Sequence, residues 1–63
     1  MKMTKQLFDG VLTIQTNSFS EVTLTFIKNQ NAADGYGISR TVHIDLFTEM
    51  LEQEFVQEAR VLL

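Results

Sequence analysis

The sequence predicts an α+β fold in which a three-stranded antiparallel meander carries one C-terminal helix packed on one face. Two observations predict this fold. Apolar and polar residues alternate with a period of two along 7–16, 21–29 and 38–44, and the pattern then changes to a helical period over 45–62. All 63 residues are expected to form a single small domain, with residues 1–5 flexible ahead of the first strand.

Each predicted strand is expected to bury one of its two sides. The first two strands are joined by residues 17–20, whose Asn and Ser residues favour a turn and therefore a hairpin. The third strand follows a longer, glycine-containing connection. The core-facing positions of the three strands are expected to be Phe8, Leu12, Ile14, Val22, Leu24, Phe26, Ile38, Val42 and Ile44.

The predicted helix begins at Asp45, whose short side chain can accept hydrogen bonds from the free N–H groups of the first turn. Its apolar stripe is expected to face the sheet. On a helical wheel the stripe consists of Phe47, Met50, Leu51, Phe55, Val61 and Leu62. Glu54 and Glu58 interrupt this stripe, and an unpaired ionised carboxylate that faced a core would cost several kcal/mol or have its pKa raised.

Arg40 is a second polar residue on a predicted core face, because it has the same strand parity as Ile38 and Val42. We expect its guanidinium to form an ion pair with Glu54, Glu58 or both, since the fork can serve two carboxylate oxygens. A local bulge that turns Arg40 outward is the alternative.

The net charge of −3 is distributed unevenly along the chain. Residues 45–63 hold five of the eight acidic residues and one cation, Arg60. This surface should disfavour phosphate backbones and favour a basic or mixed partner, although a charged helix face is commonly only a solvated one.

The composition also sets the expected environment. Without cysteine the chain can form no disulfide, and no segment approaches the roughly 20 apolar residues of a membrane span. We expect a cytoplasmic protein that does not enter a membrane. Small acidic proteins of this kind are typical accessory products of phages and other mobile elements, which is the origin we expect.

The sequence does not favour catalysis. Ser39 and His43, a candidate nucleophile and base, would lie about 13 Å apart on one strand, too far for a hydrogen bond. A single histidine without cysteine does not favour a zinc site. The glycines around Tyr36 lack the Lys-Ser/Thr pair of a phosphate-binding loop. We therefore expect no enzyme, no metal and no cofactor.

The function that we expect is that of a non-catalytic, small acidic protein-binding module acting as a regulator or inhibitor. A tyrosine held between two glycines could anchor a partner, and carboxylates on the helix could meet its basic groups. The candidate partner-binding residues are Tyr36, Asp45, Glu49 and Glu52.

A chain of 63 residues lies near the lower size limit for a single core, so we expect a homodimer. The candidate dimer contacts are apolar residues off the predicted core faces: Val11, Ile27, Leu46, Val56 and Leu63. Two alternatives remain open. One is a dimer that binds nucleic acid through a composite basic patch of Lys2, Lys5, Lys28 and Arg40, and the other is a structural subunit of a larger assembly.

Overall fold

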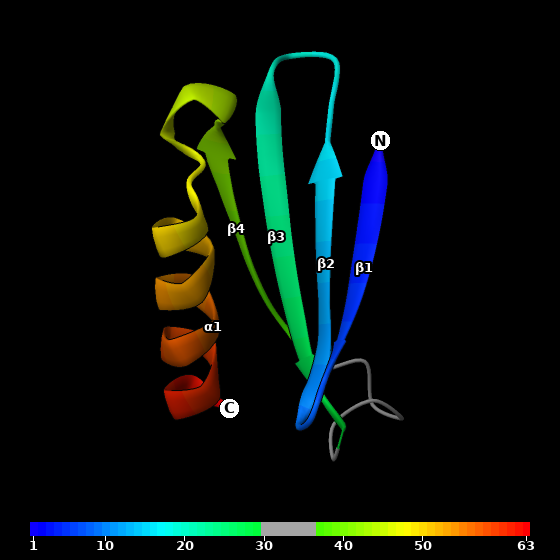
Figure 1. Cartoon of the computed structure of the whole chain (residues 1–63), viewed down its shortest axis with the longest axis vertical. Helices are drawn as coiled ribbons and strands as arrows, with labels where there is room; N and C mark the ends of the chain where they lie inside the picture. Colours follow the sequence, from blue (N-terminus) through cyan, green and yellow to red (C-terminus); the bar gives the residue numbers. More distant parts are fainter. Residues whose placement is uncertain (30–36) are drawn as a thin grey trace.

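The computed structural model describes residues 1–29 and 37–63, and it confirms the α+β class with an antiparallel sheet and one C-terminal helix (Figure 1). Within these residues the sheet has four strands, not three. They are β1 (Lys2–Leu7), β2 (Gly10–Thr16), β3 (Glu21–Lys28) and β4 (Ile38–His43). The strands form a meander in the order β1-β2-β3-β4, in which all neighbours are antiparallel. A 3-10 helix, η2 (Ile44–Leu46), follows β4 and leads to α1 (Glu49–Leu62).

The first predicted strand is divided by a turn at Phe8 and Asp9, after which Gly10 begins β2. The residues before the turn pair with β2 as the edge strand β1. The predictions of a single strand over 7–16 and of a flexible 1–5 segment are therefore wrong. Phe8 was predicted to face the core, but it lies in the turn and is 87% exposed. The two-residue loop is Phe8-Asp9, and Gly10 follows it as the fourth residue of the turn, a position that glycine favours and that was the signal for this break.

The core lies between the central strands and α1. Its buried residues are Leu12, Val22, Leu24, Phe26, Phe55, Val56 and Ala59. The strand members of this set were all predicted to face inward, because each has the correct parity in a strand that buries one side. Ile14, Ile38 and Val42 pack against the same core and are partly buried.

The α-helix begins one turn later than predicted. Thr48 is its N-cap, and the Thr48 hydroxyl accepts a hydrogen bond from the Leu51 N–H at 3.1 Å. Asp45 lies in η2 instead, and the extended backbone of Phe47 separates η2 from α1. Threonine and aspartate are both good N-caps, so residue type alone did not distinguish the two starts.

The core-facing side of α1 also differs from the predicted stripe. It is centred on Phe55 and Ala59, which are 1% and 0% exposed. Three residues of the predicted stripe instead lie exposed: Met50, Val61 and Leu62. Glu54 and Glu58 are exposed as well, so the carboxylates that seemed to interrupt the stripe do not face the core.

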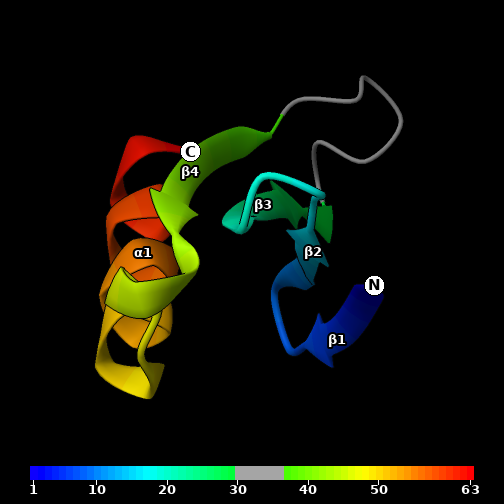
Figure 2. The ribbon, with the colours of Figure 1, turned by 90° about the horizontal axis from the view of Figure 1, so that it is seen from above.

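α1 covers only part of the sheet. Four strands about 4.8 Å apart occupy about 19 Å, whereas one helix is about 10 Å wide. α1 packs mainly against β3, and viewed from above it lies near β4 while β1 forms the far edge (Figure 2). We call the helix-side surface of β1 and β2 beside α1 the uncovered half-face, because α1 covers it only partly. Its members are Met3, Lys5, Leu7, Ile14 and Thr16, of which Leu7 and Ile14 also pack against the core.

Candidate functional site

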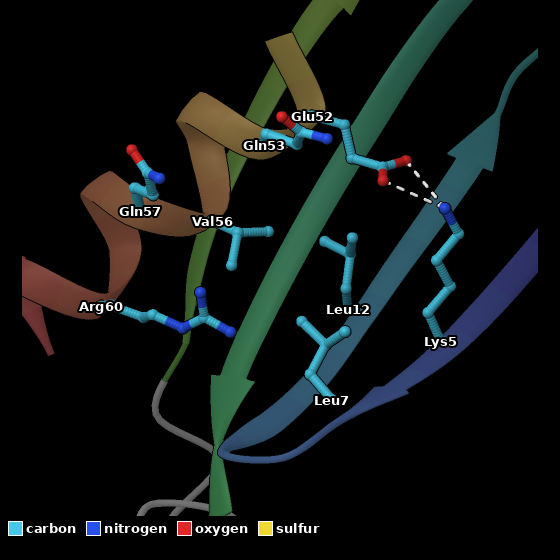
Figure 3. A pocket seen from close by; sticks show the side chains of 8 residues that line it. All are labelled: Lys5, Leu7, Leu12, Glu52, Gln53, Val56, Gln57 and Arg60. Atoms are coloured by element: carbon cyan, nitrogen blue, oxygen red, sulfur yellow. Dashed lines mark hydrogen bonds and ion pairs between the residues drawn. The ribbon is translucent and has the colours of Figure 1, made fainter. Parts of the chain in front are cut away.

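A groove lies between α1 and β1, and Lys5 and Leu7 of the uncovered half-face line it (Figure 3). Its volume is about 230 Å³. Leu7 and Leu12 from the sheet and Val56 from α1 form its apolar floor. The polar residues that line it are Lys5, Glu52, Gln53, Gln57 and Arg60. An apolar floor with amide and charged groups at its edges is the chemistry of a binding groove.

An ion pair between β1 and α1 crosses this groove. Lys5 Nζ donates to both carboxylate oxygens of Glu52, at 3.0 and 3.2 Å (Figure 3). The Glu52 side chain is only 16% exposed. Glu52 was predicted to lie on the water-facing side of the helix as a partner-binding residue, and that placement is wrong because the helix is rotated toward β1.

A second ion pair fixes the end of α1 to the β1–β2 turn. Arg60 donates from Nε and Nη2 to the two carboxylate oxygens of Asp9, at 2.6 and 3.0 Å. The guanidinium also lies 4.9 Å from the ring centroid of Phe8, and Lys28 Nζ donates to the Arg60 carbonyl at 2.9 Å. The hydrogen bond from Arg60 lowers the pKa of the Asp9 carboxyl below its ordinary value.

The lowered pKa predicts how acid acts on the fold. The folded chain binds the Asp9 proton less tightly than the unfolded chain, so the pair stabilises the fold above the ordinary carboxyl pKa of about 3.9. That contribution is lost as the pH falls through the lowered pKa. Asp9→Asn should therefore destabilise the fold most at neutral pH. The difference in free energy of unfolding between wild type and Asp9→Asn should shrink below about pH 4.

Urea denaturation of both proteins across this pH range measures the difference. Asp45→Asn is the control, since the Asp45 side chain is 85% exposed. A difference in free energy of unfolding between wild type and Asp9→Asn that stays constant down to about pH 2 would contradict the stabilising role of the Asp9–Arg60 ion pair.

The structure brings Arg40 and Glu58 together, as the strand parity led us to expect. Arg40 Nη2 donates to Glu58 Oε2 at 2.6 Å, and the guanidinium carbon lies 5.9 Å from the centroid of the Phe55 ring. The two side chains are 46% and 57% exposed, so this pair lies at the edge of the helix and not in the core. No bulge turns Arg40 outward, since it pairs with the buried Leu24 in the β3–β4 ladder.

The two arginine pairs should differ in their contribution to stability. Arg40→Ala should lower the free energy of unfolding by about 0.5–1 kcal/mol, because exposed ion pairs contribute little. Arg60→Ala should cost more, since Arg60 makes two hydrogen bonds, contacts one face of the Phe8 ring and has a side chain that is only 31% exposed. Thermal and urea unfolding of the two variants measure these losses of stability. A larger loss of free energy of unfolding for Arg40→Ala than for Arg60→Ala would contradict the expected order.

The other predicted partner-binding residues are dispersed. Tyr36 lies outside the described residues. Asp45 and Glu49 are exposed, in η2 and in the first turn of α1. Asp45 is close to His43, whose Nδ1 accepts a hydrogen bond from the Asp45 N–H at 3.2 Å.

The predicted dimer contacts do not form one surface. Val56 is 7% exposed and belongs to the core, and Leu63 is partly buried against it, so their expected positions off the core stripe are wrong. The reason is again the rotation of α1. Val11 and Ile27 are half-buried partners in the β2–β3 ladder, on the side of the sheet away from α1. Leu46 is 64% exposed in η2.

The four cations of the predicted basic patch do not share one surface. Lys5, Lys28 and Arg40 lie on the helix side of the sheet, where each donates to a group on α1. Lys2 pairs with Gln15, whose position in the alternation is on the opposite side. The composite patch therefore does not form within one copy of the chain.

A second groove, missed by the sequence analysis, lies where η2 faces the ends of β1 and β2. It has a volume of about 210 Å³, and its lining is almost entirely apolar: Met1, Met3, Ile14, Thr16, Val22, Ile44 and Phe47. This groove could not be predicted from the sequence, because Met1 and Met3 were assigned to a flexible segment and the strand β1, which forms one of its walls, was therefore missed.

Comparisons of the chain with protein-family models, with curated proteins and with solved structures give no match. In the part of the chain that the structure describes, no cluster of three or more His, Asp or Glu side chains is placed to hold a metal ion. Neither does a helix among these residues have the length and apolar character needed to span a membrane.

Proposed function

We propose that the chain is a non-catalytic protein-binding module that acts as a regulator or inhibitor of a partner with a basic or mixed surface. The observation that carries this proposal is an exposed surface at the start of the helical segment, which we call the η2 patch. It consists of Ile44, Asp45, Leu46 and Glu49. Apolar residues at the centre of a patch and charged residues around them are typical of protein interfaces.

The ion pairs around the groove support a binding role. Lys5 pairs with Glu52, and Arg60 pairs with Asp9, so these charges link α1 to the sheet. These ion pairs act as structural clamps between the helix and the sheet. The Lys5–Glu52 pair also holds the first turn of α1 in place, which lowers the entropy cost of presenting the adjoining η2 patch.

Affinity capture with matched baits tests the proposal. Asp45→Asn/Leu46→Gln removes one carboxylate and one apolar side chain from the η2 patch. Phe19→Gln/Glu21→Gln removes the same two types of group in the β2–β3 hairpin, where Phe19 is 78% exposed. A protein captured from the source cells is identified by mass spectrometry and then titrated, purified, against each variant.

We expect the η2 variant to weaken the affinity for the purified partner by at least about tenfold, and the hairpin variant to leave it nearly unchanged. Equal affinities for the two variants would contradict the proposal. Binding of a single-stranded oligonucleotide that weakens steeply with salt would instead favour the nucleic-acid alternative.

A further inference from the structure

We propose that the uncovered half-face receives the outward stripe of helix α1 from a second copy of this chain. The inference rests on the proposed function, because it names a copy of the chain as the first protein that this module binds. The outward stripe is the row of residues on α1 opposite its core-facing side: Met50, Glu54, Gln57 and Val61. All four are exposed.

The width of the sheet leaves room for a second helix. One helix about 10 Å wide covers about half of a four-stranded sheet, and α1 packs mainly on β3. On the other half, Met3 is 51% exposed, and Leu7 and Ile14 are only partly buried. A helix from a second copy would complete the layer and bury these side chains.

The chemistry of the two surfaces is complementary. The outward stripe runs from an apolar residue, Met50, through Glu54 to an apolar residue, Val61. The helix-side residues of β1 run in the same order, from Met3 through Lys5 to Leu7. Lys5 Nζ has three donor hydrogens, of which Glu52 accepts two hydrogen bonds, so one donor remains for a carboxylate of a second copy.

The lengths of the two surfaces are also similar. The stripe extends about 16 Å along the helix, at 1.5 Å per residue. Met3 and Leu7 are about 13 Å apart along β1, at about 3.3 Å per residue.

The direction of the chain decides how the two copies meet. α1 runs in the same direction as β1, because Lys5 pairs with Glu52 near the helix start and Asp9 pairs with Arg60 near its end (Figure 1). A two-fold axis parallel to the strands, between the two helices, keeps that direction and places each α1 on the open half of the other sheet. Both helices then lie side by side between two sheets, in an isologous contact.

In this arrangement Met50 of one copy lies near Met3 of the other and Glu54 lies near Lys5, whereas Val61 lies level with the β1–β2 turn, because the neighbouring Arg60 pairs with Asp9. Each α1 uses its two sides differently: Phe55 and Ala59 pack on its own sheet, and the outward stripe packs on the sheet of the second copy. The exposed apolar residues of α1 thereby gain a partner surface of the same chemistry.

Sedimentation equilibrium measures the association first. We expect a mass of about 14 kDa, twice the 7.2 kDa of the chain, at micromolar concentration. Met50→Glu should raise the dissociation constant at least tenfold, whereas Phe19→Glu, which changes another exposed apolar residue to the same acid, should not. Glu54→Lys is the second variant, and it should weaken association because it faces a like charge at Lys5. Circular dichroism establishes that each variant is folded.

Cross-linking then tests the geometry, because the chain contains no native cysteine. We expect Met3→Cys and a tagged Met50→Cys, mixed and oxidised, to form a disulfide-linked heterodimer, and Phe19→Cys mixed with the same tagged variant not to form one. A wild-type chain that stays at 7.2 kDa at about 100 µM would overturn the inference. A dimer that gives no Met3–Met50 cross-link, or that Met50→Glu affects no more than Phe19→Glu does, would also overturn it.

The test separates this inference from the proposed function. If the chain is a monomer that still binds a partner through the η2 patch, the uncovered half-face does not receive a second copy. The proposed protein-binding role then remains intact. A dimer with the expected cross-link supports the inference even where Asp45→Asn/Leu46→Gln has no effect on capture, a result that would overturn the proposed function alone.

Discussion

Replacing Phe55 by alanine should lower the free energy of unfolding by about 3–5 kcal/mol, the largest loss that we expect from a single side-chain truncation in this chain. Phe55 is 1% exposed and is the largest side chain that α1 contributes to the core. Its removal leaves a cavity between the helix and the central strands, and a small domain has little stability with which to absorb it. Urea denaturation followed by circular dichroism measures the loss.

Phe19→Ala is the matched control, since Phe19 is 78% exposed in the β2–β3 hairpin and should change stability by no more than about 0.5 kcal/mol. Where Phe55→Ala does not fold at all, Phe55→Leu keeps most of the volume and should show a smaller loss. Equal losses for Phe55→Ala and Phe19→Ala would mean that α1 does not cover the sheet as described.

Side-chain alternation was sufficient to identify the central strands. Leu12, Val22, Leu24 and Phe26 were placed correctly because each lies in a strand with one buried and one open side, where parity alone decides the direction. The same reasoning placed Arg40 beside α1 and so anticipated its contact with Glu58. It could not determine that this contact is exposed, because that depends on how α1 is rotated.

The edge strand β1 carried a weak sequence signal. Its sequence, KMTKQL, holds two lysines and alternates poorly, and lysine is typical of strands that protect a sheet edge. Such a strand is stabilised by its ladder with β2 more than by burial, so hydropathy does not reveal it. The candidate groove depended on this strand, since Lys5 and Glu52 are far apart in sequence and meet only when β1 exists.

The rotation of α1 could not be deduced from hydrophobicity because residue size misled the helical wheel. Ala59 is fully buried but weakly apolar, and Met50 is strongly apolar but exposed. Close approach of α1 to the sheet requires a small side chain at its contact point, which a search for large apolar residues overlooks. In the proposed dimer, the exposed Met50 is part of the surface that meets the second copy.

Gly10→Ala should lower the free energy of unfolding by about 1–3 kcal/mol, although it adds only one methyl group. The new Cβ would meet the backbone oxygen of Ile27 and would lie 2.9 Å from Phe26 Cζ and 3.0 Å from the Lys28 Cα. Two of these three atoms are backbone atoms of β3, so relief requires β2 and β3 to separate where they pair. Ser39→Thr, which adds one carbon to an exposed residue of β4, should stay within about 0.5 kcal/mol of wild type. Urea denaturation midpoints measure the stability of both variants, and a Gly10→Ala variant as stable as Ser39→Thr would contradict the close contact between the start of β2 and β3.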